Sequence, residues 1–411
     1  MGSEMCIRDR LYVYAPLPIV KILQITKKPP FPLNDGESWA VRNLARSLKL
    51  YGCDIDLLSI ASDIEEVERW THEVTDIYES IDIIRHDTQP RRLGALINLF
   101  SSKSYHQTRY EDVKKSLDIN LFDGPYDVIL AETLYTMPIA LSLSQNLGTP
   151  IVLRAHNQEY LIWEEYSDHS PGLKKWYFHN QSRRIHKYEL DMIRKSSGVL
   201  FVSGQDQNLI KGLSPMSSQV VPIALELPEF KPSYVISEPI ILGFLGSLDW
   251  KPNIQGLQRF LNEIWPHLKS SSRDMRLMIA GKNPDRALLS IDDDDISFIG
   301  QVEDSAGFLS QLHAMITPLW SGSGTRVKIL EAMSLGVPII TTSKGCEGLD
   351  VKDGEHLFIA DTTEDWIRAL EATYNHDVVH LLRAKARDYI FDRHDLQSTG
   401  ELAMNFLRSV V

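Results

Sequence analysis

Short runs of β-branched and apolar residues alternate along this chain with longer stretches in which apolar residues recur at helical spacing. The first run, KILQIT, spans residues 21–26, and the second, DIDLLSI, spans residues 54–60. Between them lie a loop rich in Pro, Asn, Asp and Gly and a stretch of helical periodicity. A strand, a helix and a second strand in this order form a βαβ unit, whose strands lie parallel. The sequence therefore predicts an α/β fold with parallel sheets.

The helix of this first unit is predicted to have Ser38 as its N-cap. Its apolar positions, which favour a buried face, are Trp39, Val41, Leu44 and Leu48. The same alternation continues toward the C-terminus. Further strands are predicted at residues 127–133, 150–156, 199–204, 219–225, 240–246, 276–281, 296–300, 314–319, 337–342 and 356–360.

A proline-rich segment with little periodicity, LPEFKPSYVISEP, separates two halves of similar size. We interpret residues 229–238 as a linker between an N-terminal Rossmann-like domain (21–228) and a C-terminal one (239–388). Residues 389–411 are expected to form a helical segment that packs back on the N-terminal domain. Residues 1–20 are expected to be a leader outside the fold. One large sheet is the alternative arrangement.

Composition limits the partners of the chain. Of its 411 residues, 43 are Lys or Arg and 55 are Asp or Glu, which gives a net charge of −12. This acidic balance argues against nucleic acid, and any anionic ligand then needs a local basic pocket. The sparse cysteines, Cys6, Cys53 and Cys346, favour reduced thiols and a cytoplasmic location. No apolar run approaches the ~18 residues of a transmembrane helix.

Two parallel sheets also predict where a ligand binds. Ligands of such sheets lie beyond the carboxyl ends of the strands, and with two domains the natural site is the cleft between them. One loop in such a place has the composition of an anion site: after Leu319, a glycine loop with Gly324 and Thr325 leads into a helix predicted to start near Thr325. Unpaired backbone N–H groups and the helix dipole attract an anion at that point.

Two cations lie where this helix begins. Arg326 and Lys328 are disfavoured there by the dipole, unless an anion lies between them and the helix end. A diphosphate has the charge to satisfy both. The alternative is that Lys328 pairs with Glu331 while Arg326 is solvated.

Three further residues are candidates by position. Glu331 could accept hydrogen bonds from the two hydroxyls of a ribose, as an acidic residue does in dinucleotide folds, or it could be a plain surface glutamate. His156 follows a predicted strand at the cleft end, where a functional and a structural role are both open. Gly36 would let the backbone approach a ligand closely, or it serves only the turn.

Together these segments resemble the family 4 (group 1) retaining glycosyltransferases, which have the GT-B fold. The likeness covers about residues 21–370 and is greatest to bacterial members used in cell-surface polysaccharide assembly. The motifs that carry this resemblance are KILQITKKPPFPLNDGES, LRAHNQEYLIW, FVSGQD, GFLGSLDWKPNIQGL, LMIAGK and GSGTRVKILEAMSLGVPIITTSKGCEGL. The last of them is the most specific.

The resemblance implies two Rossmann-like domains whose parallel sheets face each other across a cleft. A nucleotide-diphosphate sugar would lie mainly on the C-terminal domain, and a glycan or lipid-linked acceptor on the N-terminal one. Neither a metal ion nor a cofactor is implied, because protein cations and a helix end neutralise the departing diphosphate. The implied reaction transfers the sugar to an acceptor hydroxyl with retention of configuration.

The family's site residues map onto this chain one by one. Glu331 matches the glutamate that binds the donor ribose, His156 a histidine near the donor sugar and diphosphate, and Gly36 a glycine facing the phosphates. The segment from Gly246 to Lys251 matches one that supplies phosphate-binding cations.

The sequence departs from the family pattern in three places. The first glutamate of the family's pair is Ser323, a common phosphate-binding arginine is Ser247, and the Asn-Gly often found near PIAL is absent. We therefore expect Arg326 and Lys328, helped by Lys251, to hold the diphosphate charge.

Other functions remain open at this stage. A nucleotide-sugar epimerase on the same scaffold and a non-catalytic nucleotide-binding protein are the alternatives. The spacing of Asp54 and Asp56 would suit a DxD-type metal site. Residues 174–195 hold seven Lys or Arg against two Asp or Glu, beside three aromatic residues, which suits either contact with an anionic membrane leaflet or a solvated helix face.

Overall fold

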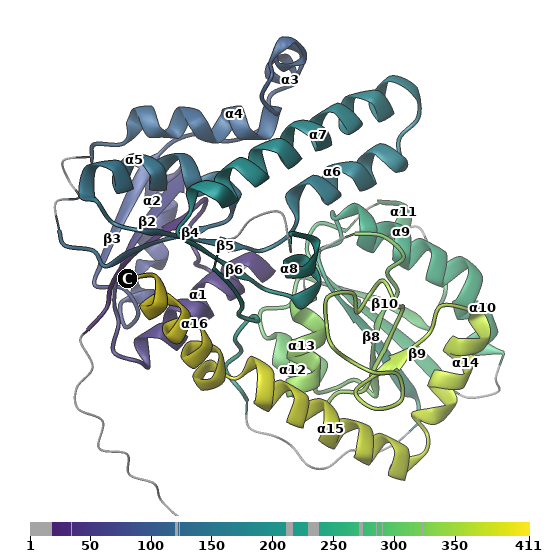
Figure 1. The fold of residues 1–411 in the computed structure, drawn as a ribbon. Helices are drawn as coiled ribbons and strands as arrows, with labels where there is room; N and C mark the ends of the chain where they lie inside the picture. Colours follow the sequence, from purple (N-terminus) through teal and green to yellow (C-terminus); the bar gives the residue numbers. More distant parts are fainter. Residues whose placement is uncertain are drawn as a thin grey trace, which may run out of the picture.

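The computed structural model describes residues 19–33, 35–119, 122, 124–210, 217–228, 238–270, 274–284, 286–289, 291–322, 324 and 326–411. It contains two parallel sheets with helices packed around each, and α15 and α16 run along one side of both (Figure 1). Most of the expected leader and linker, as well as Ser323 and Thr325, lie outside the described residues.

The N-terminal sheet has seven strands in the order β3-β2-β1-β4-β5-β6-β7. The strands are β1 (Lys21–Thr26), β2 (Asp54–Ala61), β3 (Ser80–Arg85), β4 (Val128–Glu132), β5 (Ile151–Ala155), β6 (Gly198–Phe201) and β7 (Ser218–Val220). The α-helices are α1 (Gly36–Lys49), α2 (Ile64–Trp70), α3 (Arg92–Ile97), α4 (Tyr105–Glu111), α5 (Met137–Leu147), α6 (Glu159–Asp168), α7 (Gly172–Lys195) and α8 (Gly204–Ile210). The 3₁₀ turns in the described part of this domain are η1 (Thr71–Val74), η2 (Asn98–Phe100), η3 (Asp112–Ser116) and η5 (Leu134–Thr136).

The C-terminal sheet has six strands in the order β10-β9-β8-β11-β12-β13. The strands are β8 (Ile240–Leu245), β9 (Met275–Ala280), β10 (Ile296–Gly300), β11 (Ala314–Thr317), β12 (Ile339–Thr341) and β13 (Phe358–Ile359). The helices are α9 (Lys251–Arg259), the π-helical η6 (Phe260–Ile264), α10 (Trp265–Lys269), α11 (Arg286–Leu289), α12 (Ser305–Leu309), α13 (Val327–Ser334), α14 (Thr363–Ala372), α15 (His376–His394) and α16 (Leu396–Val410).

Strand order places a crevice in each sheet. In the N-terminal sheet the first and fourth strands are neighbours, with Gln24 opposite Leu130. In the C-terminal sheet β8 and β11 are neighbours in the same way, with Leu242 opposite Ala314. The chain order reverses at these two pairs, and ligands of doubly wound sheets bind at the carboxyl ends of such pairs.

Two details differ from the sequence-based expectation. The predicted N-cap Ser38 is wrong, because α1 begins at Gly36 and the carboxylate of Asp35 accepts hydrogen bonds from the backbone N–H groups of Glu37 and Ser38. Strand β3 was not predicted. It is an edge strand with a partly exposed pattern, so its apolar residues alternate with polar ones such as Asp82 instead of forming a continuous run.

The two domains share an apolar interface. Ala40 of α1, Val202 and Ile223 are buried in one cluster with Val327 and Ile329 of α13. This contact holds the start of α13 against the start of α1. Because apolar burial is the dominant stabilising term in such interfaces, the cluster keeps the two helix ends together without a covalent link.

The last helix of the chain returns to the N-terminal sheet. Met404 and Leu407 of α16 are buried together with Leu44 and Leu48 of α1. The expected boundary between residues 388 and 389 falls inside α15, and the domain bounds remain a prediction. None of the helices in the described part of the chain combines the length and the apolar character that a membrane span requires.

Candidate active site

The amino ends of two helices, one from each domain, meet at a cavity of about 320 Å³. A Cβ atom on Gly36, where α1 begins, would lie 3.1 Å from Cγ2 of Val327, where α13 begins. The loop after β8 borders the same cavity. The polar and aromatic lining includes Asp35, Trp39, Phe244, Ser247, Trp250, Asn253, Lys282, Thr317, Arg326 and Lys328, together with Gly36 and Gly246.

Arg326 is buried at this junction, with 9% of its surface exposed. It occupies the N-cap position of α13, and its Nη2 donates a hydrogen bond to the carbonyl of Gly322 at 2.7 Å. Its guanidinium carbon lies 5.4 Å from the centre of the Trp250 ring. Burial lowers the pKa of Arg326 to about 10, so the side chain remains charged at neutral pH. The alternative of a solvated Arg326 is therefore wrong.

Lys328 and Glu331 form the ion pair that their spacing allowed. Lys328 Nζ donates to Glu331 Oε2 at 2.8 Å, and the same Nζ lies 5.9 Å from the centre of the Trp39 ring, in the facing domain. Glu331 is not a plain surface residue: only 8% of it is exposed, and its second oxygen accepts a hydrogen bond from Ser305. The ion pair leaves Lys328 on the cavity wall, and the ribose contact of Glu331 remains a prediction.

The cavity is also lined by a cation that sequence reasoning did not select. Lys282 follows β9 by two residues and is part of the cavity wall. Its position at the carboxyl end of a strand was the available signal. Lys251, which was selected, begins α9 and is exposed, and it is not among the residues that line this cavity.

The glycine loop before α13 is fixed against the N-terminal domain. Gly322 and Gly324 have φ angles of +93° and +96°, which L-residues with a side chain rarely adopt. The N–H of Gly322 donates to the carboxylate of Glu165 on α6. A Cβ atom on Gly324 would lie 2.8 Å from Oδ1 of Asn157, so glycine is also required by space.

His156 lies in a second, smaller cavity of about 160 Å³ that Gly36 and Gly324 also line. Its Nε2 is 2.6 Å from Oε2 of Glu132, at the end of β4. Sequence reasoning selected His156 and missed Glu132, whose place at the carboxyl end of the central strand β4 was the available signal. The structure thus brings the histidine and both glycines to one point of the cleft.

Glu132 is fully enclosed by polar partners. Gln24 Nε2 donates to its Oε1 at 2.7 Å, and Arg154 Nη1 lies 3.5 Å from the same oxygen. Burial alone would raise the pKa of Glu132, but Arg154 and the hydrogen bond from His156 outweigh it and hold the pKa below its usual range. The carboxylate is therefore charged at neutral pH.

A second ion pair borders the cavity that contains His156. Lys27 Nζ lies 2.9 Å from Oε2 of Glu37. Burial favours a lower pKa for Lys27, yet Glu37 and Glu159 raise it above the usual value. Both members are therefore charged, and they give this part of the cleft a fixed polar lining.

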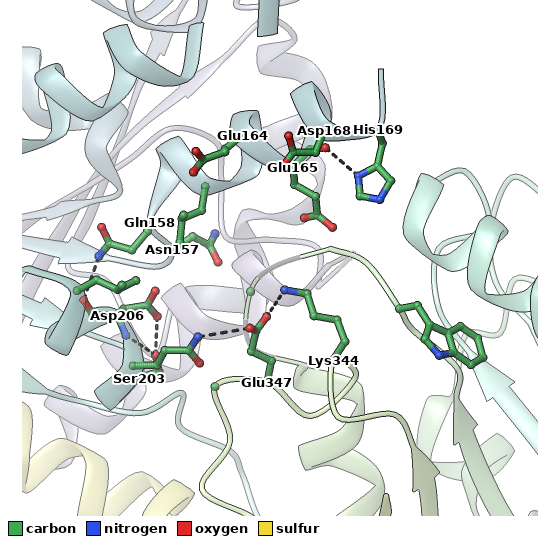
Figure 2. Close-up of a pocket in the computed structure, with 16 residues that line it drawn as sticks. Asn157, Gln158, Glu164, Glu165, Asp168, His169, Ser203, Asp206, Lys344 and Glu347 are labelled. Carbon is green, nitrogen blue, oxygen red and sulfur yellow. Dashed lines mark hydrogen bonds and ion pairs between the residues drawn. The ribbon is translucent and has the colours of Figure 1, made fainter. Parts of the chain in front are cut away.

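A third cavity of the cleft, about 550 Å³, has an acidic lining (Figure 2). Its walls come from α6, from the start of α8, and from the segments around Trp320 and Glu347 in the C-terminal domain. Its charged side chains are Glu164, Glu165, Asp168, Asp206, Glu347 and Lys344. Opposite charges are thus sorted between neighbouring cavities, with cations concentrated around Arg326.

The DxD alternative lies elsewhere. Asp54 and Asp56 are at the amino end of β2, whereas the cleft lies at the carboxyl ends of the strands. Asp56 accepts a hydrogen bond from Tyr126 at 2.9 Å and lies 3.5 Å from Lys21 Nζ. These partners give Asp56 a structural role away from the site.

Two facing Rossmann-like sheets with a cleft between them define the GT-B class, and solved structures share this arrangement. Sucrose-phosphate synthase from Thermosynechococcus elongatus superposes with a TM-score of 0.70 at 15% identity, over 95% of this chain and 99% of that one. A point mutant of S. aureus TarM, in complex with Fondaparinux, alpha-GlcNAc-glycerol and UDP, gives 0.69 at 10% identity, over 95% and 100%. Anabaena HepE in complex with UDP-glucose gives 0.62 at 13% identity, over 95% and 99%.

The sequence of the C-terminal domain indicates which group of GT-B proteins the chain is similar to. Residues 239–376 match the family model described as "Glycosyl transferases group 1". An uncharacterized 44.6 kDa protein in the cps region of Klebsiella pneumoniae is 23% identical over 363 residues, which are 84% of this chain and 88% of that protein. Residues 239–376 are therefore a group 1 glycosyltransferase domain, and the chain is a glycosyltransferase with the GT-B fold.

Proposed function

We propose that this enzyme transfers a sugar from a nucleotide-diphosphate sugar to a hydroxyl of a glycan or lipid-linked acceptor, with retention of configuration and without a metal ion. The proposed pathway is the assembly of a cell-surface polysaccharide. The enzyme would act in the cytoplasm, with peripheral contact to the inner membrane leaflet. The observation on which the proposal rests is the charged Arg326, buried at a helix start between two domains.

The geometry supports binding of a diphosphate in the cavity beside Arg326. Among the described residues, Arg326, Lys328 and Lys282 are the cations that line it, and Asp35 is the one acidic residue there. The amino ends of α1 and α13 both meet there, and each adds partial positive charge. Held in a partly enclosed cleft, these groups would stabilise negative charge more strongly than they would in water.

In the proposed reaction the bond between the anomeric carbon and the diphosphate oxygen breaks, and a bond to the acceptor oxygen forms on the same face. Negative charge develops on the leaving oxygen, where Arg326 and Lys328 are already in place. Such preorganised groups commonly contribute a few kcal/mol each to transition-state stabilisation. The proton of the acceptor hydroxyl passes to the leaving phosphate. His156 orients the sugar, and Glu331 holds the ribose.

The named neighbours support the choice of substrates. One solved structure holds UDP-glucose and another holds UDP with a glycan, and the Klebsiella relative is described by its cps region. Taken together, these descriptions support a nucleotide-diphosphate sugar as the donor and a glycan as the acceptor. The acidic lining of the cavity of about 550 Å³ favours a neutral or cationic group over an anionic one at the acceptor end.

Two experiments test the proposal. A thermal-shift panel of nucleoside diphosphates should identify one base that stabilises the protein, by about 2.7 kcal/mol at 100 times its dissociation constant. With the matching sugar donor, NMR of the product should show retained configuration, and turnover should persist in EDTA. Inversion, or turnover that requires a divalent ion, would contradict the proposed mechanism. An epimer formed from the donor alone would favour the epimerase alternative.

A further inference from the structure

Four strongly exposed apolar side chains gather on α3 and η2, at the outer edge of the N-terminal domain. Leu93, Leu96, Ile97 and Phe100 are 70%, 60%, 65% and 96% exposed, and we call this group the α3 knob. In Figure 1, α3 stands clear of the domain above α4 and α7. Neighbouring apolar side chains left in water in this way commonly mark an interaction site.

The base of the α3 knob is fixed to α7. Arg184 donates from Nη1 to the carbonyl of Asn98 at 3.0 Å and from Nη2 to the carbonyl of Leu99 at 3.2 Å. Gln181 Nε2 donates to Oδ1 of Asn98 at 3.2 Å, and Asn98 itself is buried. A network of this kind holds the turn in place while the four apolar side chains stay exposed.

The surroundings of the α3 knob are basic, although the chain as a whole has a net charge of −12. Residues 90–103 contain Arg91, Arg92 and Lys103 and no Asp or Glu, and residues 172–187 of α7 contain five Lys or Arg and no Asp or Glu. Two of these cations have acidic partners: Asp87 lies 2.9 Å from Arg91, and Glu111 pairs with Lys103. Each of these pairs cancels one positive charge at close range, so the basic character of this surface comes chiefly from α7, whose residues 172–187 include no Asp or Glu.

The outer side of α7 extends this basic surface. One side of this helix carries Trp176, His179, Arg183 and Lys187, which follow one another at intervals of three or four residues. All four side chains are exposed, Trp176 by 55%, and the other three are polar. Gln181 and Arg184, which hold the base of the α3 knob, belong to the same helix as this basic row. The apolar knob and the basic residues are therefore carried by elements in direct contact.

We propose that the α3 knob and the basic side of α7 dock the enzyme on an anionic lipid bilayer. The four apolar side chains would enter the boundary of the acyl region, and the Lys and Arg side chains would contact the head groups. A protruding group of long apolar side chains next to a basic helix suits a fluid surface, which needs no preformed groove. The inference rests on the proposed function, since a lipid-linked acceptor presents its hydroxyl at such a surface.

The test is co-sedimentation of the full-length protein with vesicles of phosphatidylglycerol and phosphatidylethanolamine, compared with vesicles of phosphatidylcholine. The unmodified protein should partition at least about tenfold more strongly to the anionic vesicles, and added salt should weaken this. The variant Leu96→Ser/Ile97→Ser/Phe100→Ser should lose at least about tenfold of that partition. The matched control Leu381→Ser/Phe391→Ser, which changes side chains 56% and 60% exposed on α15, should not.

Several results would overturn the docking surface. The docking surface would be refuted if the knob variant partitioned to anionic vesicles as strongly as the unmodified protein. It would also be refuted if the α15 control lost as much partition as the knob variant. A knob-dependent change of oligomeric state without vesicle binding would instead identify a second copy as the partner. The thermal response to nucleoside diphosphates, measured without vesicles, separates the two proposals: its absence in the unmodified protein would count against the transferase function and leave the vesicle result standing.

Discussion

The Nε2 atom of His156 lies 2.6 Å from Oε2 of Glu132, and both side chains are buried at the carboxyl ends of neighbouring strands. The carboxylate fixes which edge of the imidazole ring faces the protein. The other ring nitrogen is then left for a ligand in the cavity that His156 lines. Glu132 is therefore a positioning residue that acts through His156.

Replacing Glu132 tests this coupling. Glu132→Gln keeps the size and removes the charge, so we expect kcat to fall about tenfold, against about a hundredfold for His156→Ala. The double variant should resemble His156→Ala alone, because Glu132 has no separate target. Steady-state kinetics measure the cycle, with the thermal response to nucleotide as a check on folding. Losses that multiply in the double variant would show that Glu132 acts independently of His156.

Arg326 should be the cation on which turnover depends most. Arg326→Ala removes the buried charge at the start of α13, and we expect kcat/KM to fall by at least about two orders of magnitude, as when a preorganised transition-state donor is lost. Arg326→Lys should recover part of the loss. Arg276→Ala, an exposed arginine on β9, serves as the matched control. Near-normal turnover of a folded Arg326→Ala protein would refute the assigned role.

The two lysines beside the loop after β8 should behave differently. Lys282 lines the diphosphate cavity and Lys251 is exposed outside its lining. Lys282→Ala should raise the dissociation constant of the nucleoside diphosphate about tenfold, because a partly buried cation is lost. Lys251→Ala should change it less than about twofold. Isothermal titration calorimetry measures both, and the reverse order would restore Lys251 as the phosphate contact.

Glu189 on α7 should make the stability depend on pH. Burial, reinforced by Glu159, raises the pKa of Glu189 to about 8. Its carboxyl binds a proton in the folded protein up to that pH, whereas the unfolded chain releases the proton near pH 4.5. The stabilisation is thus complete below pH 4.5 and is lost as pH rises toward 8, by up to about 1.4 kcal/mol per pH unit.

The variant Glu189→Gln isolates this contribution. It cannot titrate, so its free energy of unfolding should fall less between pH 5 and pH 8 than that of the unmodified protein. Denaturant unfolding at both pH values measures the difference. Parallel pH profiles for the two proteins would mean that Glu189 is already ionised in the fold.

Much of the fold could be predicted from local pattern. Strand β1 is rich in apolar residues because an inner parallel strand is covered on both faces, and its observed bounds match the predicted ones. The bounds of β10 match as well, although it is an edge strand in which exposed and partly buried residues alternate. Edge strand β3 was missed because one-sided burial breaks the run. The cap of α1 was misplaced by three residues, because Asp35 and Ser38 are both good N-cap residue types and sequence does not show which one the backbone selects.

The site was predicted in part. Arg326, Lys328, His156 and Gly36 were chosen because each follows a strand or begins a helix, and the structure brings them to the cleft. Glu132 ends a strand and Lys282 follows one, yet nothing in the local sequence separates them from ordinary polar residues. Their importance comes from partners that are distant in the chain, such as Gln24, which lies 108 positions from Glu132.

The sequence by itself determined the parallel sheets and the glycine-to-helix loop, because strand periodicity and the backbone freedom of glycine are local properties. Only the tertiary structure decided that Arg326 is buried, that Glu331 is enclosed and that Trp39 faces Lys328. Burial and electrostatic environment depend on which distant segments pack together, and that packing is a property of the whole chain.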